Sequence, residues 1–150
     1  MDQWILTLLT FVPLLGAAVI LLMPGQKANL IRWISVVTTG VCVLLAIWLF
    51  MSFDRAESGM QYRVQIPWIP SFNIDYHVGI DGLSVTMVLL TALLSFLCMP
   101  ASWGVERGVK GYFALFLLLE TGMQGVFVSV DFFLFYVFWE IMLLPMYFLI

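Results

Sequence analysis

The residue of this sequence best suited to chemistry is Glu140, an acid inside the otherwise apolar and aromatic stretch DFFLFYVFWEIMLLPMYFLI, residues 131–150. In a helix rising about 1.5 Å per residue, Glu140 would lie roughly 12–14 Å beyond Asp131, near the middle of a bilayer core about 30 Å thick. A charged carboxylate at that depth costs at least about 2.5 kcal/mol, so an acid there is a candidate proton-transfer residue. The alternative is a protonated Glu140 that only hydrogen-bonds a neighbouring helix.

Pro145 lies five residues after this acid. Proline has no N–H, and its ring crowds the carbonyl four residues back, so we expect a bend that frees the Ile141 carbonyl. Membrane helices tolerate proline, so Pro145 alone says little. Together, the acid and the freed carbonyl indicate a place where water could enter.

Glu120 is the second candidate, in the apolar run before Asp131. Asp131 itself is expected to cap the start of the last helix rather than take part in chemistry. Glu120 lies eleven residues before Asp131 and Glu140 nine after it, so on antiparallel helices their depths would differ by only about 3 Å. Two acids at one level suit a proton relay, but Glu120 could equally hold two helices together, and the sequence does not decide whether the two acids face each other.

The composition indicates the setting for these acids. The chain is 63% hydrophobic, 16% aromatic and only 10% charged, which no soluble domain of this length could bury. Five apolar runs long enough to span a bilayer lie at about 4–23, 33–53, 83–103, 112–130 and 132–150. No positive segment precedes the first run, so we expect that helix to be retained. No polar or basic stop follows the fifth, so we expect the chain to be part of a longer protein.

The segment between the second and third runs follows a different pattern. Apolar and polar residues alternate on both sides of Pro67 and Pro70, which predicts a β-hairpin outside the membrane at about 60–80. His77 falls on the polar face of this hairpin, where we expect a solvated side chain rather than a ligand or a proton relay.

Lysine and arginine counts predict the orientation of the spans. The loops after the first and third spans hold four of these residues: Lys27, Arg32, Arg107 and Lys110. The segment that contains the hairpin holds two, Arg55 and Arg63. We therefore expect the N-terminus and the hairpin to lie on the outer side of the membrane.

Other kinds of site find little support in the sequence. Cys42 and Cys98 lie singly in apolar runs, with no CxxC or Cys/His cluster, so we expect inert thiols and no metal site. No Arg-rich span, Gly-rich phosphate loop or basic nucleic-acid patch is present.

Two stretches carry a resemblance to a known family. GIDGLSVTMVLLTALL, residues 79–94, and the terminal stretch around Glu140 look like the M subunits of bacterial NADH:quinone oxidoreductase, respiratory complex I. Those subunits are similar to Mrp-type cation/proton antiporter subunits. The resemblance implies an all-α polytopic membrane fold of fourteen helices. Five of them would lie in this chain, as three N-terminal helices and the first two of an inverted five-helix repeat.

The resemblance also implies roles for the acids. In that family the glutamate matching Glu140 is a proton-channel residue that works with a lysine on a broken seventh helix, beyond residue 150. Glu120 lies outside the family's most invariant motif, so the resemblance gives weaker support to a role for Glu120 in proton transfer. The implied function is proton translocation coupled to quinone reduction. The alternatives are an Mrp-type antiporter subunit or a membrane scaffold whose buried acids join helices.

The same resemblance implies the chain's surroundings. No cofactor would bind this chain, because FMN, iron–sulfur clusters and quinone would belong to other subunits. Its partners would be the other membrane-arm subunits and the lipid bilayer, with no nucleic acid. The implied location is a bacterial inner membrane, with the N-terminus in the periplasm.

Overall fold

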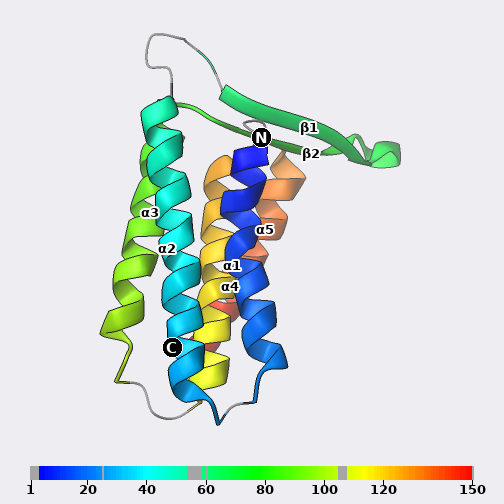
Figure 1. Ribbon diagram of the computed structural model, residues 1–150. Coiled ribbons are helices and arrows are strands. Elements are labelled where there is room, and N and C mark those ends of the chain that lie inside the picture. The colour runs from blue at the N-terminus through cyan, green and yellow to red at the C-terminus, as the bar shows by residue number, and fades with distance from the viewer. Residues whose placement is uncertain (1–3, 25, 54–58, 60, 105–107, 150) are drawn as a thin grey trace.

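The computed structural model describes residues 4–24, 26–53, 59, 61–104 and 108–149. Its five long helices are α1 (Ile5–Leu22), α2 (Ala28–Ser52), α3 (Gly82–Ala101), α4 (Val109–Val128) and α5 (Phe132–Leu149). All five are long and apolar enough to cross a membrane, which confirms the polytopic helical fold. Figure 1 shows them as a bundle, with a two-stranded hairpin lying across one end.

α4 is the centre of the bundle. It packs most extensively against α5 and α1, and it also contacts α2 and α3. α5 is the least buried of the five helices, because it touches the bundle mainly through α4. Much of its surface therefore remains apolar and exposed.

Two helices begin earlier than the predicted spans. α2 begins at Ala28 and α4 at Val109, so Arg32 and Lys110 lie in helices rather than in loops. Long cationic side chains at a helix end can reach the membrane surface. The Arg32 guanidinium donates to Asn29 Oδ1 at 3.1 Å and lies 5.9 Å from the centroid of the Trp103 ring.

The predicted hairpin is present. Strands β1 (Gln61–Ile69) and β2 (Ile74–Ile80) are antiparallel, with Val64 opposite Val78. The turn is shorter than expected, because Pro67 extends β1 and only the 3-10 turn η2 (Pro70–Phe72) with Asn73 connects the strands. Asn73 has φ 55°, a left-handed conformation that asparagine tolerates better than most residues.

The hairpin is tied to the bundle through the connection between α4 and α5. Val78 forms a β-bridge with Ser129, and the Val130 N–H donates to the His77 carbonyl at 2.8 Å. The side chains of Val78 and Ile80 in β2 are buried and belong to the hydrophobic core of the bundle. The adjoining ends of α1 and α2, and those of α3 and α4, lie at the opposite end of the bundle (Figure 1). Lys27, Arg32 and Lys110 lie at or near this end, so the length of the helices separates them from the hairpin.

Candidate functional site

Glu140 lies on the exposed face of α5. It is eight residues after the first residue of that helix, so it lies about 12 Å along the helix axis. A shallow hollow of about 270 Å³ surrounds it, and the other lining residues are aromatic: Phe132, Phe135, Tyr136 and Trp139. The acid therefore lies near the middle of α5, on an apolar, outward-facing surface.

Close contacts between α4 and α5 fix this outward direction. A methyl group on Gly122 would lie 2.8 Å from the backbone nitrogen of Met142, and one on Gly125 would overlap the ring of Phe138. Phe138 and Met142 therefore face α4. A helix turns by about 100° per residue, so Glu140, two residues from each, points to the opposite side.

Glu120 has the contrasting environment. Its side chain is fully buried in the bundle, and the Cys42 thiol of α2 lies beside it. Neither carboxyl oxygen has a hydrogen bond of good geometry among the described residues. An unpartnered buried carboxylate is costly, so the neutral acid is the form that this environment favours.

Two further polar side chains of α4 share this buried position. Gln124, one turn after Glu120, and Thr121 are both buried without a hydrogen-bond partner among the described residues. Buried hydroxyls on the other helices behave differently. Thr10, Ser35, Thr39 and Thr91 each donate to a carbonyl of the preceding turn of their own helix. The unsatisfied groups are therefore concentrated on one stretch of α4.

The two glutamates do not meet. Glu120 points into the bundle and Glu140 away from it. Because α4 and α5 are antiparallel, a step forward along one matches a step backward along the other. Two such steps from the Gly122–Met142 contact place Glu140 level with Gln124, and Glu120 level with Leu144. Four residues on α5 correspond to a difference in depth of about 6 Å, against the predicted 3 Å. A direct relay between these two acids is not formed within the described chain.

Pro145 does not end the last helix. α5 continues through it to Leu149, and Pro145 itself is buried. The expected bend and the water entry at Ile141 remain predictions.

Asp131 caps α5, as predicted. Its Oδ1 accepts from the N–H groups of Phe133 at 2.9 Å and Leu134 at 3.2 Å, while Oδ2 accepts from the Asp75 N–H of the hairpin at 3.3 Å. Partial burial acts to raise the pKa of Asp131. The three backbone N–H groups outweigh it, so the pKa is lowered from its ordinary value of 3.8. One carboxylate thus joins the hairpin to the helix that carries Glu140.

His77 lies on the polar face of the hairpin, as expected from the alternation. Its Nε2 is 3.4 Å from the Arg63 guanidinium, and it is partly exposed. Within the described residues, no group of three or more His, Cys, Asp or Glu side chains could hold a metal ion.

Sequence reasoning missed the environment of Glu120. Cys42 was expected to be inert and isolated, whereas it lies beside the acid. The spacing of Glu120 and Gln124, one helical turn apart, was a usable signal for a shared face. No sequence signal placed Cys42 next to them, because that contact joins different helices.

Comparison with known proteins gives a consistent relationship. No protein-family model matches the chain. It is 39% identical over 153 residues to NADH-quinone oxidoreductase subunit M of Rhodobacter capsulatus, covering 99% of this chain and 29% of that protein. It is 43% identical over 126 residues to the subunit M of Escherichia coli strain K12, covering 79% of this chain and 25% of that protein.

The fold agrees with the sequence relationship. A chain of respiratory complex I from Thermus thermophilus with bound NADH superposes with a TM-score of 0.77 at 30% identity, covering 93% of this chain and 27% of that chain. The present chain therefore spans between a quarter and three-tenths of the length of these relatives. The resemblance to subunit M of NADH-quinone oxidoreductase, first seen in two stretches of sequence, is thus confirmed over most of the chain.

Proposed function

We propose that this chain forms part of a proton-translocating membrane subunit of NADH-quinone oxidoreductase, and that Glu140 is its proton-carrying acid. The proposal extends to this chain what the names of its relatives say of them. The observation that supports it is the position of Glu140 near the middle of α5, on the outward, aromatic face of that helix.

An acid in that position requires a partner. A carboxylate facing hydrocarbon is expensive, and intramembrane acids almost always face a bundle interior or a water-filled cavity. Within the described spans the basic residues lie near helix ends, as Arg32 and Lys110 do. The group that covers Glu140 therefore comes from another part of the subunit or from a neighbouring one.

The chemistry follows from two opposed effects. A cation placed beside a carboxylate favours the charged form, whereas apolar surroundings without that cation favour the neutral acid. Alternation between the two arrangements loads and releases one proton. The exposed side of α5 leaves Glu140 accessible to such a moving partner, while the packing of Gly122 on Met142 holds the helix in place.

Glu120 fits a different role. It is buried on α4 beside Cys42 of α2, away from the surface where a mobile partner could approach. We assign it to helix packing, as a neutral acid, and keep proton transfer for Glu140.

The test is to introduce Glu140→Gln into the full-length subunit, confirm assembly of the complex, and measure proton pumping in reconstituted vesicles. We expect assembly with loss of pumping, because the amide is isosteric but cannot carry a proton. Glu120→Gln is the matched control, since it makes the same change at a similar depth. Wild-type pumping in an assembled Glu140→Gln complex would reject the proposal.

A further inference from the structure

Three polar side chains of α4 form a closed cluster inside the bundle: Glu120, Thr121 and Gln124. Each of them is at most 1% exposed. Together they carry five oxygen and nitrogen atoms that have no hydrogen-bond partner among the described residues. Buried polar groups in folded proteins are nearly always paired with protein atoms or with ordered water. Five unpaired atoms in one place therefore indicate a site for a polar ligand.

The cluster occupies one side of α4. A helix turns by about 100° per residue, so Glu120, Thr121 and Gln124 lie within an arc of about 100°. Gly122 and Gly125, which meet residues of α5, lie outside this arc. The cluster therefore faces away from α5, toward the other helices of the bundle.

Contacts of neighbouring residues show which helices enclose the cluster. Cys42 of α2 is fully buried and lies beside Glu120. Leu117 lies one turn before Glu120, on the same side of α4. A Cβ atom on Gly16 of α1 would lie 3.2 Å from Leu117 Cδ1 and 2.7 Å from Thr38 Oγ1 of α2. The cluster thus lies at the seam where α1, α2 and α4 meet.

The Thr121 hydroxyl differs from the buried hydroxyls of the other helices. Those of Thr10, Ser35, Thr39 and Thr91 donate to the carbonyl four residues back. The equivalent acceptor for Thr121 is the Leu117 carbonyl, and Thr121 does not donate to it. Its hydroxyl is therefore available to a ligand of the cluster.

The available groups are a mixture of donors and acceptors. Gln124 offers an amide NH2 group and a carbonyl oxygen, a neutral Glu120 offers an O–H group and an acceptor oxygen, and Thr121 offers a hydroxyl. A water molecule both donates and accepts, and a buried one makes about three hydrogen bonds. A metal cation would use the oxygen atoms but would leave the amide NH2 group without an acceptor. The set of groups therefore fits water rather than an ion.

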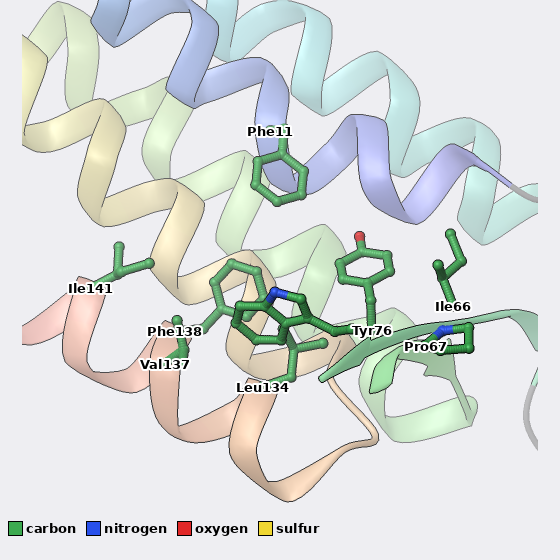
Figure 2. Close-up of a pocket in the computed structure, with 9 residues that line it drawn as sticks. Phe11, Ile66, Pro67, Tyr76, Leu134, Val137, Phe138 and Ile141 are labelled. Atoms are coloured by element: carbon green, nitrogen blue, oxygen red, sulfur yellow. The ribbon is translucent and has the colours of Figure 1, made fainter. Parts of the chain in front are cut away.

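Enclosure distinguishes this cluster from the larger hollow on the surface. That hollow, of about 380 Å³, lies between α1 and α5 beneath the hairpin and is lined by aromatic and aliphatic side chains (Figure 2). The chain spans between a quarter and three-tenths of the length of its relatives, so other parts of the subunit can cover that surface. The Glu120 cluster is already closed by the described helices, so its surroundings do not depend on such a cover.

We propose that the seam of α1, α2 and α4 contains a buried water site, in which at least one water molecule joins Glu120 to Gln124. Glu120 then supports helix packing through hydrogen bonds to water, as a neutral acid. The site faces away from α5, so the inference goes beyond the function proposed for Glu140 and does not depend on it.

The first test is hydroxyl-radical footprinting of the assembled complex containing the full-length subunit, with X-ray pulses that split water. The radicals are so short-lived that they oxidise only side chains in contact with water. Cys42 is the readout, because it is fully buried and lies beside Glu120. Met99 is the matched control, because its sulfur-containing side chain is equally buried but belongs to an apolar cluster. We expect oxidation at Cys42, and only background oxidation at Met99.

Variants connect this signal to the cluster. Combining Glu120→Leu with Gln124→Leu should reduce the oxidation of Cys42 to background, because leucine offers no hydrogen bond to water. Glu120→Gln should retain the oxidation, because an amide both donates and accepts. The proposal would be overturned if Cys42 were not oxidised in the wild type, or if Met99 were oxidised as strongly. Unchanged oxidation of Cys42 in the assembled double variant would overturn it as well.

A density map of the wild-type complex, at a resolution that shows ordered water, gives a second readout that needs no variant. We expect a peak within hydrogen-bonding distance of both the Glu120 carboxyl group and the Gln124 amide. A direct hydrogen bond between these two side chains, with no such peak, would contradict the water site. So would a peak that is contacted by oxygen atoms alone and changes when sodium replaces potassium, because it would identify a cation.

Discussion

Gly122 of α4 and Met142 of α5 meet backbone to backbone: a Cβ atom on Gly122 would lie 2.8 Å from the Met142 nitrogen and 2.9 Å from its Cα. Real Cβ atoms do not approach other atoms this closely. No side chain stands between the two helices at this point, so their separation is set by glycine. Because Met142 is held against α4, the outward direction of Glu140 depends on this contact.

We expect Gly122→Ala to push α4 and α5 apart, because backbone atoms cannot move aside as a flexible side chain can. Overpacking of this kind costs about 1–3 kcal/mol. The thermal stability of the purified complex and the amount of subunit retained in it measure the effect. Gly111→Ala is the control, since a Cβ at Gly111 of the same helix meets nothing within 4 Å. Equal stability of the two variants would contradict the close contact.

The neighbouring contact offers a rescue experiment. Gly125→Ala should also destabilise the subunit, because the added methyl group overlaps the Phe138 ring. Here the obstacle is a side chain, so Phe138→Leu in the same protein should restore part of the stability. No rescue by the smaller side chain would show that the two residues are not in contact.

The rotation of α5 shows what the sequence could not predict. Hydropathy was enough to predict five spans, and period-two alternation predicted the hairpin, because both signals are local. Counting residues predicted depths about 3 Å apart for Glu120 and Glu140, whereas the Gly122–Met142 contact places them about 6 Å apart. The sides of α4 and α5 on which these two acids lie could not be predicted either. They depend on which residues of α5 touch Gly122 and Gly125 of α4.

The predicted first residues of two helices, α2 and α4, were wrong for a different reason. Arg32 and Lys110 were taken as loop residues because charges usually mark the end of a span. In the structure they lie within α2 and α4, where a long side chain can reach the surface from inside a helix. Asp131, by contrast, was predicted as a cap from local sequence alone, and local hydrogen bonds to Phe133 and Leu134 confirm it.

We expect Asp131→Ala to weaken the start of α5 and its attachment to the hairpin. Loss of a helix cap costs about 1 kcal/mol, and the bond from the Asp75 N–H is lost as well. Asp131→Asn should retain most of this stability, because an asparagine oxygen also accepts N–H bonds. Thermal unfolding of the two variants compares them, and an alanine variant as stable as wild type would exclude a capping role.

The same residue predicts a pH dependence. Backbone N–H groups lower the pKa of Asp131 below its ordinary value of 3.8 in the folded state. A lowered folded-state pKa means that the carboxylate stabilises the fold above the ordinary value, and that this stabilisation is lost as pH falls through the folded value. The stability difference between wild type and Asp131→Asn should therefore shrink below about pH 4. A difference that stays constant through that range would contradict the charged cap.

The membrane orientation is tested by labelling. Ser58, between α2 and the hairpin, would be a natural labelling site but lies outside the described residues, so we choose exposed Ser71 in the hairpin turn. We expect Ser71→Cys to react with an impermeant maleimide in cells opened only at the outer membrane, and Gln26→Cys between α1 and α2 not to react. The reason is the excess of lysine and arginine in the loops opposite the hairpin. The reverse labelling pattern would invert the topology.

The last prediction separates the two glutamates by their surroundings. Glu120 is fully buried, and its carboxyl oxygens have no well-formed hydrogen bond. Replacing an unpartnered buried polar group with an apolar one of similar size is often neutral or stabilising. We therefore expect Glu120→Leu and Glu120→Gln to assemble, to keep stability within about 1 kcal/mol of wild type, and to retain substantial proton pumping.

Substitutions at Glu140 should behave differently. Glu140→Gln should assemble but lose pumping, and Glu140→Asp should keep part of it, because the acid is retained and only shortened. Electron transfer from NADH to an artificial acceptor should be unchanged in all four variants and serves as the control for intact redox subunits. If assembled Glu120→Gln pumped as poorly as Glu140→Gln, the buried acid would belong to the proton path. The assignment of Glu120 to helix packing would then be wrong.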